Sequence, residues 1–400
     1  MHPTIAILPG KQKRLRGGHP WAYSNEIDMT AETRALGAGS VVSVKGNDGT
    51  SFGTAHFNPH SLVGARMLSR QMDVAPDAVF FEERLTHALA LRDRFFTTPH
   101  YRLIHAEADG LPGLIVDRYG DVVVLQLNTA GMERARTDIL AAINTVLKPR
   151  LCVLRNDSPA REREGLSLGV EFAGGEPDGE GESEQGLVEV EENGVRYAVD
   201  LRQGQKTGWF FDQRENRRFV ANLAKGQRVL DFYSHSGGFG VQAAVKGAAS
   251  VTMVDRSSLA LDLAMQSARL NGVEARCEAI KGDCFSELER LGKSEERYDV
   301  VIADPPAFVK SKKDLNVGGR GYRKLARLAS ALVAPGGILF LASCSHNMAA
   351  DLFLRHVADG LRDARRTGRV LRAAGADLDH PIHPNLPESA YLKTFTLQID

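Results

Sequence analysis

Short apolar runs that alternate with helical segments dominate the chain after about residue 195. They lie near residues 228–231, 251–255, 298–303 and 337–342. This alternation predicts a parallel sheet with helices on both faces, the α/β class. Such sheets bind ligands at the carboxyl ends of their strands, near the switch point of the strand order. A charged or reactive residue stands at the end of each run, so we expect one cleft to contain Asp231, Asp255, Asp304 and Cys344.

A glycine turn after the first run predicts a nucleotide-like cofactor. Ser236-Gly237-Gly238 follows Asp231, and adjacent glycines let the backbone approach a ligand while the next helix offers free N–H groups. Asp255 lies 24 residues beyond Asp231, close to the offset of ribose-binding acids in dinucleotide folds, which makes NAD one alternative. The motif G-x-G-x-x-G is absent, however. The Asp231 carboxylate would also repel a pyrophosphate, whereas it suits the cationic amino acid end of S-adenosylmethionine, the cofactor that we expect.

Two further acidic residues complete the expected cofactor site. A further strand, the third along the α/β region, is expected to be an apolar run just before Gly282. Asp283 follows it and would accept the adenine amino group, or else cap the helix that begins beside it. Asp212 precedes the sheet and would cover the cofactor, or else pair with a nearby arginine. The residues expected to bind the cofactor are Asp212, Asp231, Ser236, Gly237, Gly238, Asp255, Asp283 and Asp304.

Cys344 and Asp304 form the expected chemical site. Carbon 5 of cytosine is a poor nucleophile, and its methylation requires a thiolate to add to carbon 6 first. Cys344 would supply that thiolate, and Asp304 would hydrogen-bond the cytosine N4 amino group or a protonated N3. Two alternatives stay open: a strand cysteine is often a small buried hydrophobe, and Asp304-Pro305-Pro306-Ala307-Phe308 is similar to loops that hold a planar amine for methylation at nitrogen.

The residues before the α/β region predict two smaller domains. Residues 1–72 contain β-like runs at Ile5–Leu8 and Val41–Val44 and are expected to form a β-rich unit. A basic cluster in this unit, expected to bind RNA together with Trp21 and otherwise a solvated loop, comprises Lys11, Lys13, Arg14 and Arg16. Residues 73–195 are expected to form a central α+β domain with helices at 80–96 and 132–147, a hairpin at 114–125 and an acidic, glycine-rich loop at 173–186. Residues 196–400 then form the α/β domain.

Composition narrows the class of protein further. Lys plus Arg total 50 and Asp plus Glu total 50, so an RNA-binding surface has to arise from local segregation of charge. The 4 cysteines lack a C-x-x-C pair, which disfavours a disulfide framework and a zinc site, and no metal is expected. Because no apolar run reaches the ~20 residues that cross a bilayer, we expect a soluble cytoplasmic protein without a membrane partner.

The chain resembles the bacterial 23S ribosomal RNA (cytosine-5)-methyltransferase I family along nearly its full length. The matching motifs are Gly18–Trp21 with Ser24–Ile27, Ala106–Leu114, Gly204–Asn216, Asp304–Phe308, Ser343–Ser345, His383-Pro384, Pro387-Glu388 and Tyr391–Lys393. The family usually reads Asp-Leu-Phe-Cys-Tyr-Thr-Gly-Gly-Phe at the glycine turn, where this chain has Ser234-His235-Ser236 before Gly237.

This resemblance implies a Rossmann-like class I S-adenosylmethionine methyltransferase domain behind an N-terminal PUA domain, with Cys344 as the nucleophile. It implies 23S ribosomal RNA, or a large-subunit assembly intermediate, as the partner, and homodimerisation is a further expectation. A vestigial, non-catalytic ribosome-assembly factor is the alternative from another class, and the intact acidic set argues against it.

Overall fold

The computed structural model describes residues 1–173, 186–204 and 207–400. The chain forms two compact units, each assembled from segments that are distant in sequence. The first comprises Met1–Gly186, Asp200–Trp209 and Leu378–Ser389, and the second comprises Leu187–Val199, Phe210–Asp377 and Ala390–Asp400. Most of the acidic loop expected at 173–186, together with Gln205 and Lys206, lies outside the described residues. Within the described residues, no helix has both the length and the apolar character needed to span a bilayer.

The N-terminal part of the first unit contains a five-stranded sheet. Its strand order is β1 (Thr4–Ile7), β3 (Ser40–Gly46), β4 (Ser51–Phe57), β5 (Ala65–Ser69) and β2 (Trp21–Ala22). The runs expected as strands at Ile5–Leu8 and Val41–Val44 are confirmed as β1 and β3, which pair in parallel. Ile5, Val42 and Phe57 are fully buried in the core, and the short helix α1 (Lys13–Arg16) contributes Leu15 to it.

A second five-stranded sheet follows in the same unit. Its strand order is β10 (Gly169–Ala173), β9 (Leu151–Asn156), β8 (Val122–Leu127), β7 (Leu114–Tyr119) and β6 (His100–His105). The predicted hairpin is confirmed, because β7 and β8 pair antiparallel. The helix expected at 80–96 is α3 (Ala78–Arg92), which begins earlier because the Asp77 side chain caps it. The helix expected at 132–147 is instead divided at Ala135 into α4 (Ala130–Arg134) and α5 (Arg136–Leu147).

A seven-stranded sheet forms the centre of the second unit. Its strand order is β15 (Cys277–Lys281), β14 (Ser250–Asp255), β13 (Arg228–Phe232), β16 (Tyr298–Ala303), β17 (Val333–Ser343), β19 (Lys393–Ile399) and β18 (Gly368–Ala374). The expected parallel sheet is confirmed from β15 through β17. Strand β19 departs from it, since it runs antiparallel to both of its neighbours. The third strand, β15, was expected to be apolar, but its residues are largely exposed at the sheet edge.

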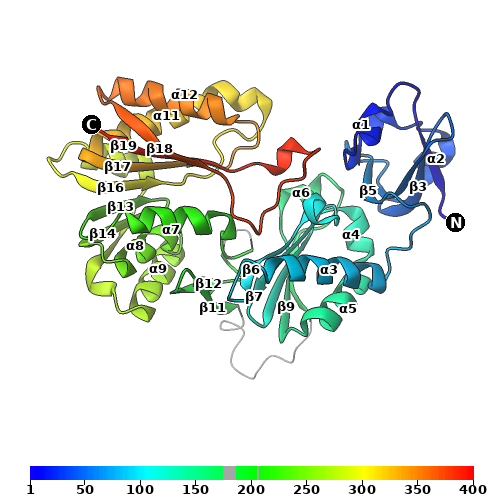
Figure 1. The fold of residues 1–400 in the computed structure, drawn as a ribbon, viewed down its shortest axis with the longest axis horizontal. Helices are drawn as coiled ribbons and strands as arrows, with labels where there is room; N and C mark the ends of the chain where they lie inside the picture. The colour runs from blue at the N-terminus through cyan, green and yellow to red at the C-terminus, as the bar shows by residue number, and fades with distance from the viewer. Residues whose placement is uncertain (174–185, 205–206) are drawn as a thin grey trace. The chain divides into compact units, whose positions relative to one another are not determined.

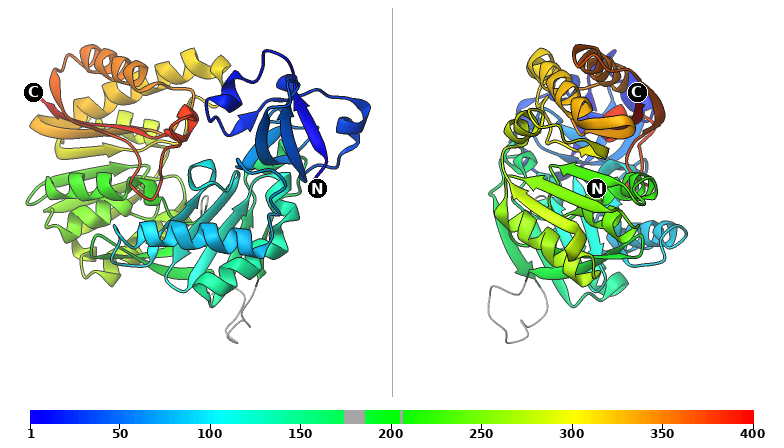
Figure 2. Two further views of the ribbon diagram at one scale, coloured as in Figure 1. Left: turned by 45° about the vertical axis from the view of Figure 1, so that its right-hand side comes forward. Right: turned by 90° about the vertical axis from the view of Figure 1, so that its left-hand side faces the viewer.

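Helices cover both faces of this sheet (Figures 1 and 2). On one side Figure 1 shows α8 (Gly238–Val245) and α9 (Ser258–Leu270), and on the other α11 (Leu315–Leu332) and α12 (Ala350–Asp363). Helix α7 (Arg214–Asn222) contacts α8, and α10 (Cys284–Leu291) contacts α11. Strands β11 (Leu187–Glu192) and β12 (Val195–Asp200) form a separate two-stranded sheet. Because helices cover both faces of the sheet, we expect ligands to bind at the loops that follow the carboxyl ends of the strands.

A buried ion pair holds the late segment 378–389 in the first unit. Arg92 is fully buried and donates two hydrogen bonds to Asp109, at 2.7 and 2.8 Å. The same guanidinium donates to the backbone carbonyl of Asp379 at 3.1 Å, and the Asp379 carboxylate accepts the N–H of Arg102 at 2.9 Å. Removing one partner of such a pair leaves an uncompensated charge in the interior.

We therefore expect Asp109→Ala to lower the free energy of unfolding of the first unit by about 3–5 kcal/mol. The matched control is Glu171→Ala, which breaks the exposed pair with Arg136 and is expected to cost less than about 1 kcal/mol. Urea titration followed by tryptophan fluorescence measures this unit selectively, because Trp21 and Trp209 both belong to it. Equal shifts of the unfolding midpoint in the two variants would contradict the assignment.

Candidate active site

Asp231 is a buried carboxylate at the carboxyl end of β13. Its Oδ2 accepts the N–H of Gly240 at 2.9 Å, in the first turn of α8. The pKa of Asp231 is raised to about 8, chiefly by burial. The negative charges of Asp304 and Asp255 contribute to this rise, while the Gly240 bond and the Arg217 guanidinium oppose it. A cation bound at this edge would relieve the repulsion among the three carboxyl groups.

The loop from β13 to α8 adopts a shape that most side chains resist. Tyr233, His235 and Gly237 all have left-handed backbone angles, with φ of 61°, 49° and 82°. Gly238 is required for a different reason, because a Cβ at this position would lie 2.6 Å from Nε of Arg217. Arg217 is held in place by Glu192, at 2.8 Å. The glycine pair therefore serves the local packing of this turn.

Asp255, at the end of β14, ties this loop to the neighbouring strand. Its Oδ2 accepts the His235 N–H at 3.0 Å, and its Oδ1 accepts the Ser257 N–H at 2.9 Å. The Ser236 hydroxyl is buried and lies 2.8 Å from Nδ1 of His235. Because each carboxylate oxygen has a second lone pair, these backbone bonds leave Asp255 able to accept hydroxyl groups of a ribose.

Asp283 and Asp212 have structural partners of their own. Asp283 is the N-cap of α10, and its Oδ1 accepts the Ser286 N–H at 3.0 Å, which confirms the capping alternative. Asp212 is buried and accepts a hydrogen bond of 2.5 Å from the hydroxyl of Tyr391. Its backbone carbonyl accepts the N–H of Asp377 at 3.1 Å.

Asp304 follows β16, beside the glycine loop. Ala303 pairs with Phe232 of β13, so Asp304 and the turn after Asp231 start from adjacent strand ends. Its Oδ2 accepts a 2.9 Å hydrogen bond from Nε2 of Gln213. The side-chain oxygen Oε1 of Gln213 in turn accepts a hydrogen bond from Nδ2 of Asn216 at 2.8 Å. This chain of bonds orients the Asp304 carboxylate.

Tyr322 connects the two loops that carry Asp304 and Cys344. Its hydroxyl accepts a hydrogen bond from Ser343 at 2.8 Å and lies 2.9 Å from the Ser345 hydroxyl. The Ser345 oxygen also accepts the N–H of Val309, which belongs to the Asp304 loop, at 3.1 Å. The residues on both sides of Cys344 are thus fixed to one buried phenol and to the neighbouring loop.

The remaining cysteines have environments that suppress thiolate formation. Burial raises the pKa of Cys152 and Cys277 to about 11 and that of Cys284 to about 12. Cys344 is only partly buried. It follows β17 and therefore lies at the carboxyl ends of the parallel strands, where the acidic residues also lie. Among the described residues, no group of acidic, histidine and cysteine side chains has an arrangement suited to a metal ion.

The basic cluster of the N-terminal sheet is only partly available for a ligand. Arg16 donates to Asp48 and to Gln12, both at 2.6 Å, and Arg14 pairs with Glu26 at 3.4 Å. The indole N–H of Trp21 donates to Glu107 at 2.7 Å, which gives this ring an intramolecular role. Lys11 and Lys13 are exposed, and neither forms an ion pair within the part of the chain that the structure describes.

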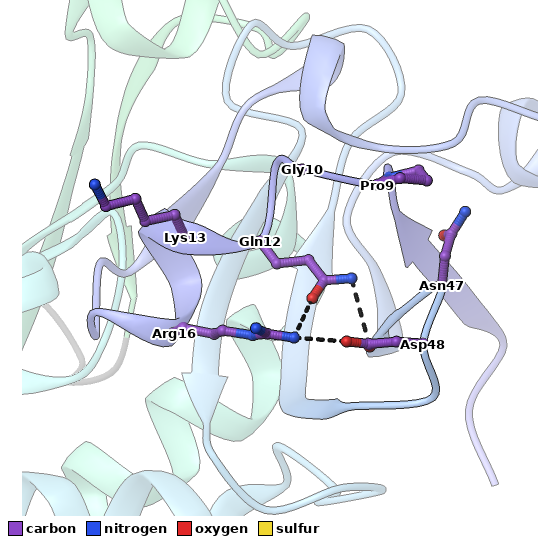
Figure 3. Close-up of a pocket in the computed structure, with 7 residues that line it drawn as sticks. All are labelled: Pro9, Gly10, Gln12, Lys13, Arg16, Asn47 and Asp48. Atoms are coloured by element: carbon purple, nitrogen blue, oxygen red, sulfur yellow. Dashed lines mark hydrogen bonds and ion pairs between the residues drawn. The ribbon is translucent and has the colours of Figure 1, made fainter.

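A hollow of about 610 Å³ adjoins the cluster (Figure 3). Its walls are Pro9, Gly10, Gln12, Lys13, Arg16, Asn47 and Asp48. Figure 3 shows Gln12, Arg16 and Asp48 bonded to one another, while the Lys13 side chain extends away from them. Amide, carboxylate and ammonium groups of this kind suit a base edge and a phosphate.

Three residues that the sequence interpretation missed form hydrogen bonds to the expected site residues or to the loops that carry them. Gln213 orients Asp304, Tyr322 fixes the loop of Cys344, and Lys393 donates hydrogen bonds beside Cys344. The sequence carried a weak signal for Gln213 and Lys393 only, since both fall within motifs of the resemblance. Nothing in the helix that contains Tyr322 distinguishes this residue from an ordinary core aromatic.

Two family models match the chain. An S-adenosylmethionine-dependent methyltransferase model covers residues 171–393, and a PUA-like domain model covers residues 5–70. Together with the seven-stranded sheet and its acidic edge, they define the class: the chain is an S-adenosylmethionine-dependent methyltransferase with an N-terminal PUA-like domain. The expected fold class and cofactor are confirmed, and the NAD alternative is set aside.

Curated relatives identify the family within this class. Ribosomal RNA large subunit methyltransferase I of Pseudoalteromonas atlantica is 36% identical over 398 residues, which are 98% of each chain. The protein of the same name from Aeromonas salmonicida is 37% identical over 397 residues, again 98% of each chain. The chain belongs to the ribosomal RNA large subunit methyltransferase I family.

Solved structures show the same fold. A putative S-adenosylmethionine-dependent methyltransferase from Streptococcus mutans superposes with a TM-score of 0.82, at 23% identity over 99% of this chain and 100% of the other. The putative methyltransferase SMU.776, complexed with SAH, gives a TM-score of 0.84 at the same identity and coverage. The likeness therefore spans both units of the fold.

We expect Asp255→Ala to weaken S-adenosylmethionine binding by ~1.5–3 kcal/mol, because a ribose hydroxyl loses a charged acceptor and the His235 loop loses its tie to β14. Calorimetry with S-adenosylmethionine and with NAD measures this. Asp262→Ala, which removes an exposed carboxylate from α9, is the matched control. Unchanged affinity for the methyl donor in Asp255→Ala, or preferential binding of NAD, would refute the assignment.

Proposed function

We propose that this protein methylates carbon 5 of a cytosine in large-subunit ribosomal RNA through a covalent bond between Cys344 and the base. The observation that carries the proposal is the hydrogen-bonded connection of Ser345, the residue after Cys344, to Tyr322 and to Val309 of the Asp304 loop. This connection supports a nucleophile and a base-holding carboxylate that act on one substrate. The names of the curated relatives support ribosomal RNA as the substrate class, either free or in an assembly intermediate.

In the proposed reaction, the Cys344 thiolate adds to carbon 6 and makes carbon 5 nucleophilic. S-adenosylmethionine supplies the methyl group as a sulfonium. The Asp304 carboxylate accepts a hydrogen bond from the N4 amino group of the cytosine, or from a protonated N3, and so favours the addition. The hydrogen bond from Gln213 holds that carboxylate in position.

The acidic edge of the sheet is the proposed cofactor site. Asp255 would accept the ribose hydroxyls, and Asp283 the adenine amino group. The buried Asp231 beside Asp304 supports binding of the cationic amino acid end, because a positive charge stabilises the ionised carboxyl groups there. The other proposed contributors are Asp212, Ser236, Gly237 and Gly238.

In this proposal the chain has three domains with different roles. Residues 1–72 form a PUA-like RNA-binding domain, residues 73–195 a central α+β domain, and residues 196–400 the methyltransferase domain, with the protein acting in the cytoplasm. Each proposed region contains one of the three larger sheets. Lys11 and Lys13 supply the phosphate contacts, and the hollow between Gln12 and Asn47 receives a nucleotide.

Replacing Lys11 and Lys13 together by Ala is expected to weaken RNA binding and to flatten its salt dependence, because each phosphate contact releases condensed counterions. Two lost contacts lower the slope of log affinity against log salt by roughly 1.4–1.8. Filter binding to ribosomal RNA fragments over a salt series measures this. The double variant Lys225→Ala and Lys246→Ala is the control. It removes the same charge from two exposed positions of the methyltransferase domain and should keep the wild-type slope. A wild-type slope in the Lys11 and Lys13 variant would identify the cluster as a solvated loop.

RNA that carries 5-fluorocytosine at its target should become covalently attached to the wild-type enzyme in the presence of cofactor, since fluorine replaces the proton whose loss releases the thiolate. Cys344→Ala should abolish both adduct and turnover while leaving cofactor affinity nearly unchanged. Denaturing gel electrophoresis with labelled RNA measures the adduct. Cys152→Ala, Cys277→Ala and Cys284→Ala serve as controls that still form it. A Cys344→Ala enzyme that methylates RNA at the normal rate would eliminate the covalent mechanism.

A further inference from the structure

Lys393 is a buried lysine beside Cys344. Strand β19 begins at Lys393, which pairs with Ser343 at the end of β17, the residue immediately before the cysteine. Only 9% of the Lys393 surface is exposed to solvent. Lysine is rarely buried unless its ammonium group is paired, so this position calls for a partner.

Two backbone carbonyls anchor the end of this side chain. Nζ donates to the carbonyl oxygen of Ser345 at 2.6 Å and to that of Tyr391 at 2.7 Å. The Ser345 carbonyl belongs to the residue directly after Cys344, so the ammonium group is fixed to the loop of the nucleophile. These bonds take two of its three N–H groups and leave one for a third acceptor.

The contacts of Lys393 place it next to Cys344, because it pairs with Ser343, the residue before the cysteine, and donates to the carbonyl of Ser345, the residue after it. Burial lowers the pKa of Lys393 to about 8, and the negative charge of the Cys344 thiolate opposes this shift. Within the residues that the structure describes, Lys393 has no carboxylate at ion-pair distance, so Cys344 is the anionic group that favours its charged form. A cysteine beside a cation forms its thiolate more readily than an isolated one.

We propose that Lys393 is a positioning residue for the reaction, whose ammonium group stabilises the thiolate form of Cys344. The inference rests on the proposed function, in which that thiolate attacks the base. The proton that leaves Sγ passes to solvent water, and the ammonium group, which stays protonated, stabilises the thiolate that remains. The thiolate then forms its bond to carbon 6. When the carbon 5 proton has left to solvent water, that bond breaks and the thiolate returns beside the ammonium group.

The test measures the alkylation rate of Cys344 by iodoacetamide as a function of pH, without RNA or cofactor, with peptide mass spectrometry to separate the four cysteines. In the wild type we expect the rate to rise with a midpoint below the ordinary cysteine value of about 8.5. In Lys393→Met the midpoint should rise by about one pH unit or more, which makes alkylation at pH 7 roughly tenfold slower. Lys393→Arg keeps the cation and should retain most of the wild-type profile.

Controls separate this electrostatic role from a structural one. Lys225→Met removes an exposed lysine and should leave the Cys344 profile unchanged. Lys393→Gln, which keeps an amide donor for the two carbonyls, is a second neutral variant in case Lys393→Met does not fold. Calorimetry with S-adenosylmethionine verifies that each variant folds. A wild-type Cys344 profile in a folded, neutral variant would overturn the inference while leaving the covalent mechanism intact, whereas turnover by Cys344→Ala would overturn the mechanism itself.

Discussion

The parallel register of β13, β14, β16 and β17 determines where Asp231, Asp255, Asp304 and Cys344 lie. Phe232 pairs with Val254 on one side and with Ala303 on the other, and Ala303 pairs with Leu341. Because side chains alternate along a strand, a slip of one residue would turn each strand-end group away from its neighbours. The register brings together groups that are separated by more than a hundred residues in the chain.

Placing several carboxyl groups at one buried edge has an electrostatic cost. The structure offsets part of it with the Gly240 N–H at the start of α8 and with the Arg217 guanidinium, yet the pKa of Asp231 stays near 8. A cationic ligand is the natural complement of such a site. Beside β17 the charge has the opposite sign, since the ammonium group of Lys393 lies next to Cys344. The two halves of the site therefore favour a positive cofactor and a negative nucleophile.

Sequence patterns located this edge because the strands that form it are continuous apolar runs, and a parallel sheet aligns their carboxyl ends. They did not reveal β19 as an antiparallel strand, nor the buried state of Lys393, which depends on carbonyl groups of Ser345 and Tyr391 that approach only in the folded chain. The interactions of the basic cluster could not be predicted from the sequence either. Its charges are visible in the sequence, but the carboxylate that neutralises Arg16 is Asp48, 32 residues away.

The atom that receives the methyl group, proposed to be carbon 5 of a cytosine, distinguishes the candidate reactions. The most direct measurement is radiolabelled methyl transfer to deproteinised ribosomal RNA from a strain that lacks this gene, followed by nucleoside mass spectrometry. We predict that the label appears in 5-methylcytidine. Label in a nucleoside methylated at nitrogen would contradict it and favour the planar-amine interpretation of the Asp304 loop, and the absence of any transfer would favour a non-catalytic RNA-binding role.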